Sequence, residues 1–567
     1  MAVLSRWSRQ QGADCLVGAG TARVRPAREY KELRMSDTVT TGEQKGFLGW
    51  VEKTGNKLPD PVFIFFYLII ALMIVSQICA WAGVSAFHPS LTNPDGTPQL
   101  EEARSLFSPE NIQQLWVEMP TTFTHFHPLG YVLVVMLGAG VAERSGLFGS
   151  AIRGAVRNAP KSLLTPLVAL IAMLSNHAAD AGYVVMIPLA AIIFASAGRH
   201  PLAGIAAAFA GVSGGFSANI TPGQLDALLF GITESAYEAS NIDGGWSVNF
   251  AGNWYFIGVL LFIYLPVIWM VTDKIIEPRL GKWVPDEDSD MKNYGDEDKP
   301  LTAGEKKGLG RAGLAILGVV ALWVFMTIGP GTPLLADGPG NEDAAWYVQA
   351  GPLFRSLVAA FLVLFLAAGW AYGSSAGTIK NHRDLVNMMA GGMKDMAYYL
   401  VLAFAAAHFV AMFGWSNLGL ISAVHGAEAI NNSGLPLPAV LGMIVLFSAA
   451  LNLFVGSASA KWALLAPVLV PMLMLVGISP DGATAAYRVG DGATNIITPL
   501  MVYFPLILVF AQRWQKSFGL GSLTAMMIPY SIWMLISGVI LMMIWLFLGF
   551  DLGPGAPAQI PVPGSAG

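Results

Sequence analysis

The sequence predicts an all-α polytopic membrane protein, with nine transmembrane helices and two re-entrant helical hairpins in an inverted repeat. Apolar residues make up 54% of its 567 residues and charged residues only 12%, against about 25% charged residues in a soluble domain. The mean hydropathy is +0.56. Lysine and arginine gather in alternate loops, as in membrane proteins, and two similar glycine-rich stretches each follow an unusually long apolar segment.

Nine apolar segments are long enough to span a bilayer, because a run of about 20 apolar residues crosses the hydrocarbon core as a helix. The predicted spans are 62–81, 128–141 with its flanks, 201–231, 254–271, 312–328, 354–372, 396–423, 483–510 and 523–548. Together with the hairpins they form one predicted transporter domain over residues 45–550, embedded in the lipid bilayer.

Two further apolar segments, 162–198 and 437–479, are too long for one crossing. As straight helices they would measure roughly 55–65 Å, about twice the thickness of the hydrocarbon core. Lys161 and Arg199 place both ends of 162–198 in the cytoplasm, whereas the loop 425–436 has no Lys or Arg and lies outside. Polar, small-residue tips occur at 175–180 and at 456–461. We therefore expect two hairpins that dip to mid-membrane and return, with their tips buried in protein.

The two termini differ in charge. The first 44 residues are polar and rich in arginine, and they lack the apolar stretch of about 7–15 residues that a signal peptide needs. We interpret 1–44 as a disordered cytoplasmic extension, with Met35 as an alternative start. The segment 551–567 is rich in proline and glycine, has no Lys or Arg, and is expected to lie in the periplasm.

An internal repeat follows the two hairpins. Residues 212–222 and 489–499 align without gaps. Gly215 lies opposite Gly492, and each stretch ends with a Thr-Pro pair. Proline frees a backbone carbonyl and glycine loosens a helix, so both stretches are expected to unwind. Because the hairpins enter from opposite sides, the repeat is inverted, and transporters bind substrate and ions where such repeats meet. The alternative is chance similarity between small-residue membrane helices.

Four charged residues are predicted to lie inside the membrane, namely Asp180, Lys461, Arg488 and Asp491. Intramembrane ionisable groups are costly and usually functional. Asp180 could carry a proton or complete an ion site, and the planar fork of Arg488 suits a substrate carboxylate. In the structural alternative, Arg488 and Asp491, three residues apart on a helix, neutralise each other.

Polar side chains at the tips and breaks offer oxygen ligands to a cation such as Na⁺. With Asp180, the candidates for ion binding are Asn176, Asn219, Thr221, Asn452, Asn495 and Thr498. Exposed carbonyls at the breaks would complete a coordination shell. The alternative for each residue is a hydrogen bond between helices. Trp462, beside the second tip, could stack on an aromatic substrate or simply pack in the interior.

Three stretches of the sequence resemble the AbgT family of p-aminobenzoyl-glutamate transporters. They read Ser-Asn-His-Ala-Ala-Asp-Ala-Gly-Tyr-Val-Val-Met-Ile-Pro at 175–188, Gly-Ser-Ala-Ser-Ala-Lys-Trp-Ala-Leu-Leu-Ala-Pro at 456–467, and Tyr-Arg-Val-Gly-Asp-Gly-Ala-Thr-Asn-Ile-Ile-Thr-Pro at 487–499. The resemblance covers about residues 45–550, and the N-terminal extension lies outside it.

The resemblance implies a fold and a function. It implies nine transmembrane helices and two hairpins in a bowl-shaped homodimer in the bacterial inner membrane, transporting p-aminobenzoyl-glutamate and, in some members, exporting sulfonamide antimetabolites. The substrate-pathway residues of the family correspond to Asp180, Ser459, Trp462, Pro480, Arg488, Asp491 and Pro499. Lys461 joins them as a second cation for the substrate carboxylates. Coupling to H⁺ or Na⁺ is expected, with no other cofactor.

Other functional classes receive little support from the sequence. Cys15 and Cys79 have no spacing typical of a disulfide framework or zinc site, no P-loop occurs, and no basic stripe suggests nucleic-acid binding. The rival readings are a passive channel and a membrane-embedded serine protease. The protease reading rests on Gly211-Val-Ser213-Gly, with His408 or His425 as the base. The repeat argues against an enzyme.

Overall fold

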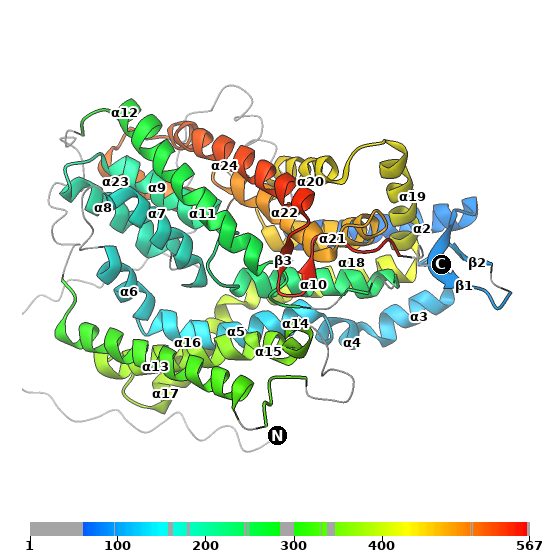
Figure 1. Ribbon diagram of the computed structural model, residues 1–567, viewed down its shortest axis with the longest axis horizontal. Coiled ribbons are helices and arrows are strands. Elements are labelled where there is room, and N and C mark those ends of the chain that lie inside the picture. The colour runs from blue at the N-terminus through cyan, green and yellow to red at the C-terminus, as the bar shows by residue number, and fades with distance from the viewer. Residues whose placement is uncertain are drawn as a thin grey trace, which may run out of the picture. The chain divides into compact units, whose positions relative to one another are not determined.

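The computed structural model describes residues 60–563, except for 96, 157–162, 179–181, 243–244, 247–248, 284–299, 330, 337–345, 499–500 and 502 (Figure 1). The predicted extension 1–44 lies outside the described residues, and so do Asp180 and Pro499. The described part of the chain is built almost entirely of helices.

The helices of the first half are α2 (Pro61–Ala82), α3 (Pro109–Val117), α4 (Met119–Thr124), α5 (His127–Arg144), α6 (Leu147–Val156), α7 (Leu164–Leu174), α8 (Ile187–Ser196), α9 (Pro201–Phe209), α10 (Gln224–Ser240), α11 (Trp254–Val271) and α12 (Glu277–Leu280). Those of the second half are α13 (Ala303–Ile328), α14 (Trp346–Gln349), α15 (Gly351–Arg355), α16 (Leu357–Ala376), α17 (His382–Asp395), α18 (Ala397–Trp415), α19 (Leu418–Asn432), α20 (Leu437–Asn452), α21 (Ala458–Met474), α22 (Pro480–Asn495), α23 (Phe504–Trp514) and α24 (Leu520–Leu548).

Two short antiparallel strand pairs interrupt the helical pattern, which the sequence did not predict. The first pairs β1 (Ser85–Thr92) with β2 (Pro98–Glu102), and the second pairs β3 (Asp551–Gly553) with β4 (Ala556–Pro557). The first pair follows α2, which ends at the left-handed Gly83. Its turn begins at Asn93-Pro-Asp95, and turns favour these residue types. The backbone N–H of Asn93 donates to the Thr97 carbonyl at 2.8 Å.

Six described helices are long and apolar enough to cross a membrane: Val62–Ala82, Trp254–Leu280, Ala303–Ile328, Leu357–Ala376, Ala397–Trp415 and Leu520–Leu548. A seventh results if His127–Arg144 and Leu147–Gly154, which are bent by 62° at their junction, form one span. These seven correspond to seven of the nine predicted spans. The other two, 201–231 and 483–510, are divided into α9 and α10 and into α22 and α23. The predicted span 396–423 also ends early, because Asn417 adopts a left-handed conformation between α18 and α19.

Each of the two overlong segments is divided into two shorter apolar helices. In 162–198, α7 and α8 are separated by a 3₁₀ turn (Ser175–Ala178) and a π-helical turn (Gly182–Met186), so the break lies at the predicted tip. In 437–479, α20 ends at Asn452 and α21 begins at Ala458, so the break starts just before the predicted tip.

The two aligned glycine-rich stretches behave differently. The first is broken as predicted: a π-helical turn (Ala210–Gly214) leads into irregular backbone that lasts until α10 begins. The second prediction was wrong at its glycines, because α22 stays helical through Gly490 and Gly492 as far as Asn495. A Cβ atom on Gly490 would lie 2.1 Å from the Val445 carbonyl oxygen of α20. These glycines therefore permit close helix packing, as in many membrane proteins.

The first break packs directly against α22. A Cβ atom on Gly492 would lie 3.0 Å from the carbonyl oxygen of Gly214. Residues from the two aligned stretches are thus in contact, and a side chain at Gly492 would press on the backbone of the first break.

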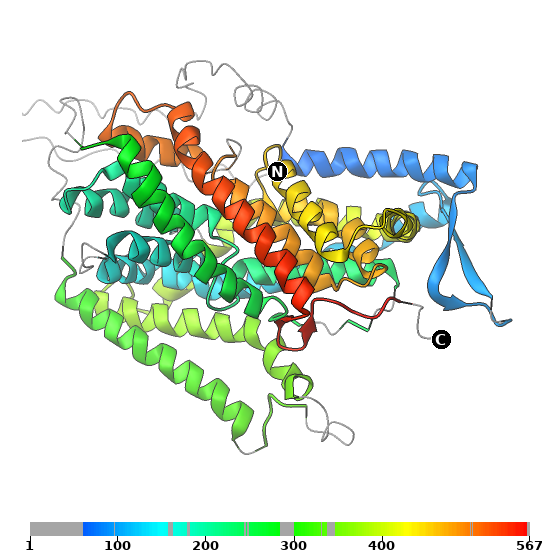
Figure 2. The same cartoon turned by 45° about the horizontal axis from the view of Figure 1, so that its top comes forward.

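Segments that the charge pattern places outside come together at one end of the helices. Trp246 Nε1 donates to Asp481 Oδ2 at 2.7 Å, and the backbone N–H of Ser479 donates to the Ala558 carbonyl at 3.1 Å. The C-terminal segment is therefore packed against the start of α22, with Leu552 fully buried. Helices α11 and α24 run side by side in both views (Figures 1 and 2), and α24 packs against α22.

Candidate functional site

Helix α10 forms a common wall of four cavities. Asp226, Leu229, Phe230 and Thr233 line the first, and Leu228 and Ile232 line a second beside α18 and α21. Two larger cavities, each with about 250 Å³ of free space, lie at the opposite ends of α10. The helix starts at the first break, where the Asp226 carboxylate accepts from the backbone N–H of Gly223 at 2.7 Å, a typical helix-start arrangement.

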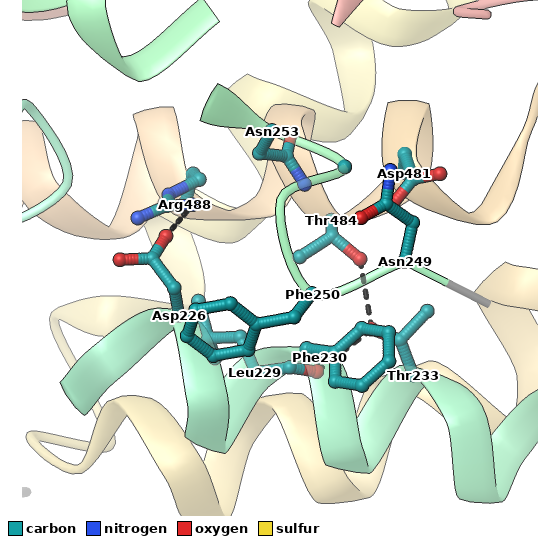
Figure 3. Close-up of a pocket in the computed structure, with 11 residues that line it drawn as sticks. Asp226, Leu229, Phe230, Thr233, Asn249, Phe250, Asn253, Asp481, Thr484 and Arg488 are labelled. Atoms are coloured by element: carbon teal, nitrogen blue, oxygen red, sulfur yellow. Dashed lines mark hydrogen bonds and ion pairs between the residues drawn. The ribbon is translucent and has the colours of Figure 1, made fainter. Parts of the chain in front are cut away.

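An ion pair between Arg488 and Asp226 lies in the first cavity. Arg488 Nη1 donates to Asp226 Oδ1 at 2.7 Å, and the two side chains are 2% and 8% exposed. Figure 3 shows them pointing toward each other from α22 and α10. Among the described residues, the buried Nε of Arg488 has no hydrogen-bond partner. The guanidinium is therefore anchored at one side while a donor stays available for another anion.

The rest of this cavity is polar and narrow. The hydroxyls of Thr233 and Thr484 lie 2.8 Å apart, and Asn249, Asn253 and Asp481 complete the polar lining. In Figure 3 the rings of Phe230 and Phe250 lie on the side of α10. The free space is about 10 Å³, which is room for about one water molecule. A substrate would need α10 and α22 to move apart to reach Arg488.

A second buried ion pair joins Lys461 of α21 to Asp491 of α22. The Lys461 ammonium also donates to Asn452 Oδ1, and the Lys461 and Asp491 side chains are 1% and 0% exposed. Asn452 Nδ2 donates to the Asp491 carbonyl at 2.7 Å and to Asn495 Oδ1 at 2.8 Å. The lysine ammonium therefore contacts the oxygens of Asp491 and Asn452, which we call the cation cage because they would also suit a monovalent cation.

The oxygens of the two aligned stretches are paired to different degrees. At the second stretch, the Thr498 hydroxyl donates to the Thr494 carbonyl at 2.8 Å and lies 3.1 Å from the Asn452 carbonyl. At the first, Ser217 Oγ and Asn219 Oδ1 are buried and have no partner among the described residues. Buried polar atoms are normally hydrogen-bonded. The first stretch thus has oxygens available for a ligand, whereas the oxygens of the second stretch are already hydrogen-bonded or ion-paired within the protein.

Trp462 packs inside the protein. Its ring stacks on Tyr487 with centroids 4.6 Å apart, and its Nε1 donates to Thr233 Oγ1 at 2.9 Å. Trp462 is fully buried, so no aromatic ligand reaches its ring in this conformation. Ser459 lines the cavity beside α18, and Pro480 occupies the first turn of α22, where its carbonyl accepts from Thr484.

The first hairpin segment borders the larger cavity at the start of α10. Asn176 lines this cavity with Tyr183, Phe216 and Gln224, and its Nδ2 donates to the Met173 carbonyl at 2.9 Å. His177 Nε2 lies 3.0 Å from Thr221 Oγ1, which ties the turn to the first break. Asn176 and Thr221 are therefore near each other, and Asp180 follows in the undescribed residues of this segment.

Two interpretations of the sequence were wrong. Arg488 and Asp491 do not pair with each other, since each faces a different neighbouring helix and finds its partner there. The list of four intramembrane charges was also incomplete. It omitted Asp226 within 201–231, and Asp481 at the start of α22, both buried. An Asp two residues inside a helix that follows Thr-Pro-Gly is a start signal that could have identified Asp226.

The protease reading also meets no supporting geometry among the described residues. The Ser213 hydroxyl lies 3.2 Å from Met501 Sδ. His408 Nδ1 contacts the Phe404 carbonyl, and His425 contacts Glu428 and the Ser85 carbonyl. A nucleophilic serine needs a base within hydrogen-bond reach, and the described residues place neither histidine there.

Comparison with known proteins agrees with this architecture. A model of the AbgT putative transporter family matches residues 46–560. The p-aminobenzoyl-glutamate transport protein of Escherichia coli (strain K12) is 36% identical over 524 residues, which are 92% of this chain and 99% of that protein.

Two solved structures are similar over their full length. MtrF of Neisseria gonorrhoeae, described as illuminating a class of antimetabolite efflux pumps, matches with a TM-score of 0.82 and 40% identity over 90% of this chain and 100% of that chain. The YdaH transporter of Alcanivorax borkumensis, described as having an unusual topology, matches with a TM-score of 0.78 and 39% identity over 88% of this chain and 100% of that chain. The chain is therefore a multi-pass membrane protein that belongs to the AbgT transporter family.

Proposed function

We propose that this protein is a secondary transporter of p-aminobenzoyl-glutamate or related aromatic amides across the bacterial inner membrane, driven by an ion gradient. The observation that carries the proposal is the buried Arg488, which Asp226 holds at one side while its Nε has no partner among the described residues. The function of the Escherichia coli relative supports the substrate class.

The substrate fits the site by its chemistry. It carries a glutamate end with two carboxylates and an aromatic amide. Arg488 would bind one carboxylate through its free donors, and Trp462 with Tyr487 would offer an aromatic surface once α21 and α22 separate. Ser459, Pro480, Asp491 and Lys461 would shape this path, together with Asp180 and Pro499 outside the described residues.

Coupling would use the oxygens at the breaks. Asp180 would carry a proton or complete a sodium site with Asn176, Asn219 and Thr221, and the unpaired oxygen of Asn219 supports a cation there. Asn452 would accept a cation only when the Lys461 ammonium leaves its side-chain oxygen, and Asn495 and Thr498 would complete that site. This exchange would link ion binding to movement of α21.

The topology that goes with this function has nine crossings, two re-entrant hairpins and a homodimer. The divided helices α7–α8 and α20–α21 support the hairpins. Export of sulfonamide antimetabolites is part of the proposal, and the description of the Neisseria gonorrhoeae relative supports it. A sulfonamide shares the anilino ring but has no carboxylate, so it would not depend on Arg488 in the same way.

Reconstituted proteoliposomes test the function. Proton and sodium gradients are imposed separately, with labelled p-aminobenzoyl-glutamate or a sulfonamide as substrate, in both directions. A secondary transporter should show saturable accumulation that collapses with its gradient. Flux that never saturates and ignores both gradients would instead identify a passive channel. A Ser213→Ala variant with full transport would remove the protease reading.

A further inference from the structure

A second large cavity lies at the end of α10 far from the first break. It has about 250 Å³ of free space and is lined by Tyr131, Phe230, Glu234, Phe250, Arg355 and Val358. The lining combines one cation, one carboxylate and three aromatic rings. The charge pattern of the sequence places this end of α10 outside the membrane.

The two charged residues of the cavity are not paired with each other. Arg355 ends α15 and is exposed, and no carboxylate of the described residues lies within ion-pair distance of it. It is near enough to act electrostatically on Glu234. Glu234 is buried and is held through Oε2 by the Tyr131 hydroxyl at 3.0 Å and by His127 Nδ1 at 3.3 Å. Both contacts use Oε2, and Oε1 has no hydrogen-bond partner among the described residues. Arg355 and one carboxylate oxygen are therefore both available.

Two aromatic residues separate this cavity from the Arg488 pocket. Phe230 and Phe250 line both spaces, and their rings form an edge-to-face pair with centroids 6.1 Å apart. Phe230 also packs against Tyr131 at 5.6 Å and Phe250 against Phe361 at 6.2 Å. A movement of this ring pair would connect the outer cavity to Arg488.

We infer that the outer cavity is a second substrate-binding site, in which Arg355 binds a carboxylate before or after Arg488 does. The inference rests on the proposed function. It adds a second binding site on the substrate path and makes the Phe230–Phe250 ring pair a gate between the two sites. The ligand class is an aromatic amine that carries a carboxylate at its other end. The carboxylate lies at Arg355, the ring lies against Tyr131 and the Phe230–Phe250 pair, and the amine N–H donates to Glu234. This arrangement explains why Glu234, whose carboxylate would repel an anionic ligand, lines the same cavity as Arg355: it faces the amine end of the ligand.

The inference predicts a defect confined to one face and one class of ligand. In proteoliposomes of known orientation, Arg355→Gln should raise the KM for p-aminobenzoyl-glutamate added at the outer face roughly tenfold, the effect of losing a charged hydrogen bond. The KM at the inner face should stay unchanged. Arg355→Lys should lie between, because it keeps the charge but loses the fork. Sulfanilamide, which has the amine and ring but no carboxylate, should be carried with unchanged KM.

A matched control is Arg104→Gln. Arg104 is an exposed arginine in a loop predicted to lie on the same side, with its side chain 66% exposed and only a 3.9 Å contact to Glu101. It removes the same charge from that face without touching the cavity, so its KM values should match wild type. Glu234→Ala should raise the outer KM for both ligands, since both carry the amine, in a variant that still elutes as a folded protein.

Several results would overturn the inference. Wild-type kinetics in Arg355→Gln, an equal rise at both faces, or the same rise in Arg104→Gln would each remove Arg355 as a carboxylate site. A normal outer KM for both ligands in Glu234→Ala would remove the contact to the amine. Wild-type protein is assayed in every preparation. If it fails to carry p-aminobenzoyl-glutamate at all, the proposed function fails, which is a different result from an active wild type beside an unaffected Arg355 variant.

Discussion

Arg488 and Asp226 form a buried ion pair although they lie 262 residues apart in the sequence. Arg488 belongs to α22, which follows the second divided apolar segment, and Asp226 belongs to α10, which follows the first break. Their contact at 2.7 Å links the two halves of the repeat. Asp226 also caps its own helix by accepting from Gly223. The position of Arg488 is therefore tied to the first break, so a change in that break would be transmitted to the candidate substrate site.

Arg488→Lys separates a carboxylate anchor from a structural cation. The lysine keeps the charge but has no planar fork, so binding of p-aminobenzoyl-glutamate should weaken by about 2 kcal/mol or more. Binding of sulfanilamide, which has no carboxylate, should change much less. Calorimetric titration of the purified protein with both ligands measures the difference. Equal losses for both ligands would indicate a damaged site, and wild-type binding of both would refute the anchor.

Asp226→Asn tests the structural side of the same pair. It leaves the Arg488 charge buried without its partner, which should destabilise the fold by about 3–5 kcal/mol. The melting temperature in detergent should fall clearly. The exchanged pair, Arg488→Asp with Asp226→Arg, should restore part of the stability but none of the transport. If Asp226→Asn melts like wild type, another group must hold Arg488.

Lys461→Met tests the cation cage around Asp491. The variant leaves a fully buried carboxylate and the Asn452 oxygen without the ammonium, so it should be less stable, by about 3–5 kcal/mol in a medium without small cations. Sodium should recover part of the loss because it can fill the same oxygens, and stability should then depend on sodium concentration. Thermal melts in sodium and in choline chloride measure this. The exposed Lys307→Met is the control, and equal melts of Lys461→Met in both salts would count against the cage.

The sequence predicted the long helices better than the side-chain partners. Seven spans follow from apolar length alone, since a helix of about 20 apolar residues crosses the bilayer with all its backbone groups paired within the segment. The break at 212–222 followed from local glycine and proline chemistry. Partners across helices depend instead on which face of each helix meets which neighbour. Arg488 and Asp491 are three residues apart, yet α10 and α21 pack on α22 and supply Asp226 and Lys461 as nearer partners.

Glycine was the least predictable residue type. Gly215 lies in the irregular backbone after a π-helical turn, whereas the aligned Gly492 lies in a regular helix. A sequence cannot tell a glycine that permits unwinding from one that permits close approach, because both need the absence of a Cβ atom. The two roles are distinguished only by the backbone that lies next to the glycine in the fold, which for Gly490 is that of Val445.

Gly490→Ala tests this role of close packing. The added methyl group would meet the Val445 carbonyl oxygen at 2.1 Å and the Ala449 backbone nitrogen at 2.9 Å, and neither backbone atom can move freely. Overpacking of this kind should cost about 1–3 kcal/mol. Gly313→Ala is the control, since it lies inside α13 with open space around it and should be neutral or slightly stabilising. Melting temperatures of both variants measure the contrast, and a neutral Gly490→Ala would mean that the glycine serves a helix opening instead.

The hairpin topology predicts which residues face the same side of the membrane. In a background with Cys15 and Cys79 replaced by serine, single cysteines at Leu163 and Ser196, both exposed at the ends of the first divided segment, should be labelled only from the cytoplasm by an impermeant maleimide. If α7 and α8 instead crossed the bilayer once, end to end, these positions would lie on opposite sides, and the two helices together measure about 50 Å at 1.5 Å per residue.

The second divided segment provides the mirror test. Leu435 lies just before α20, and Gln559 bridges Ile478 just before α22; both are exposed. Cysteines at these two positions should be labelled only from the periplasm. The inverted repeat requires both results together, since opposite entry of the two hairpins is what relates Gly215 and Gly492 by inversion rather than by simple duplication. Opposite-side labelling within either pair would remove that hairpin, and same-side labelling of all four positions would leave two hairpins but no inversion.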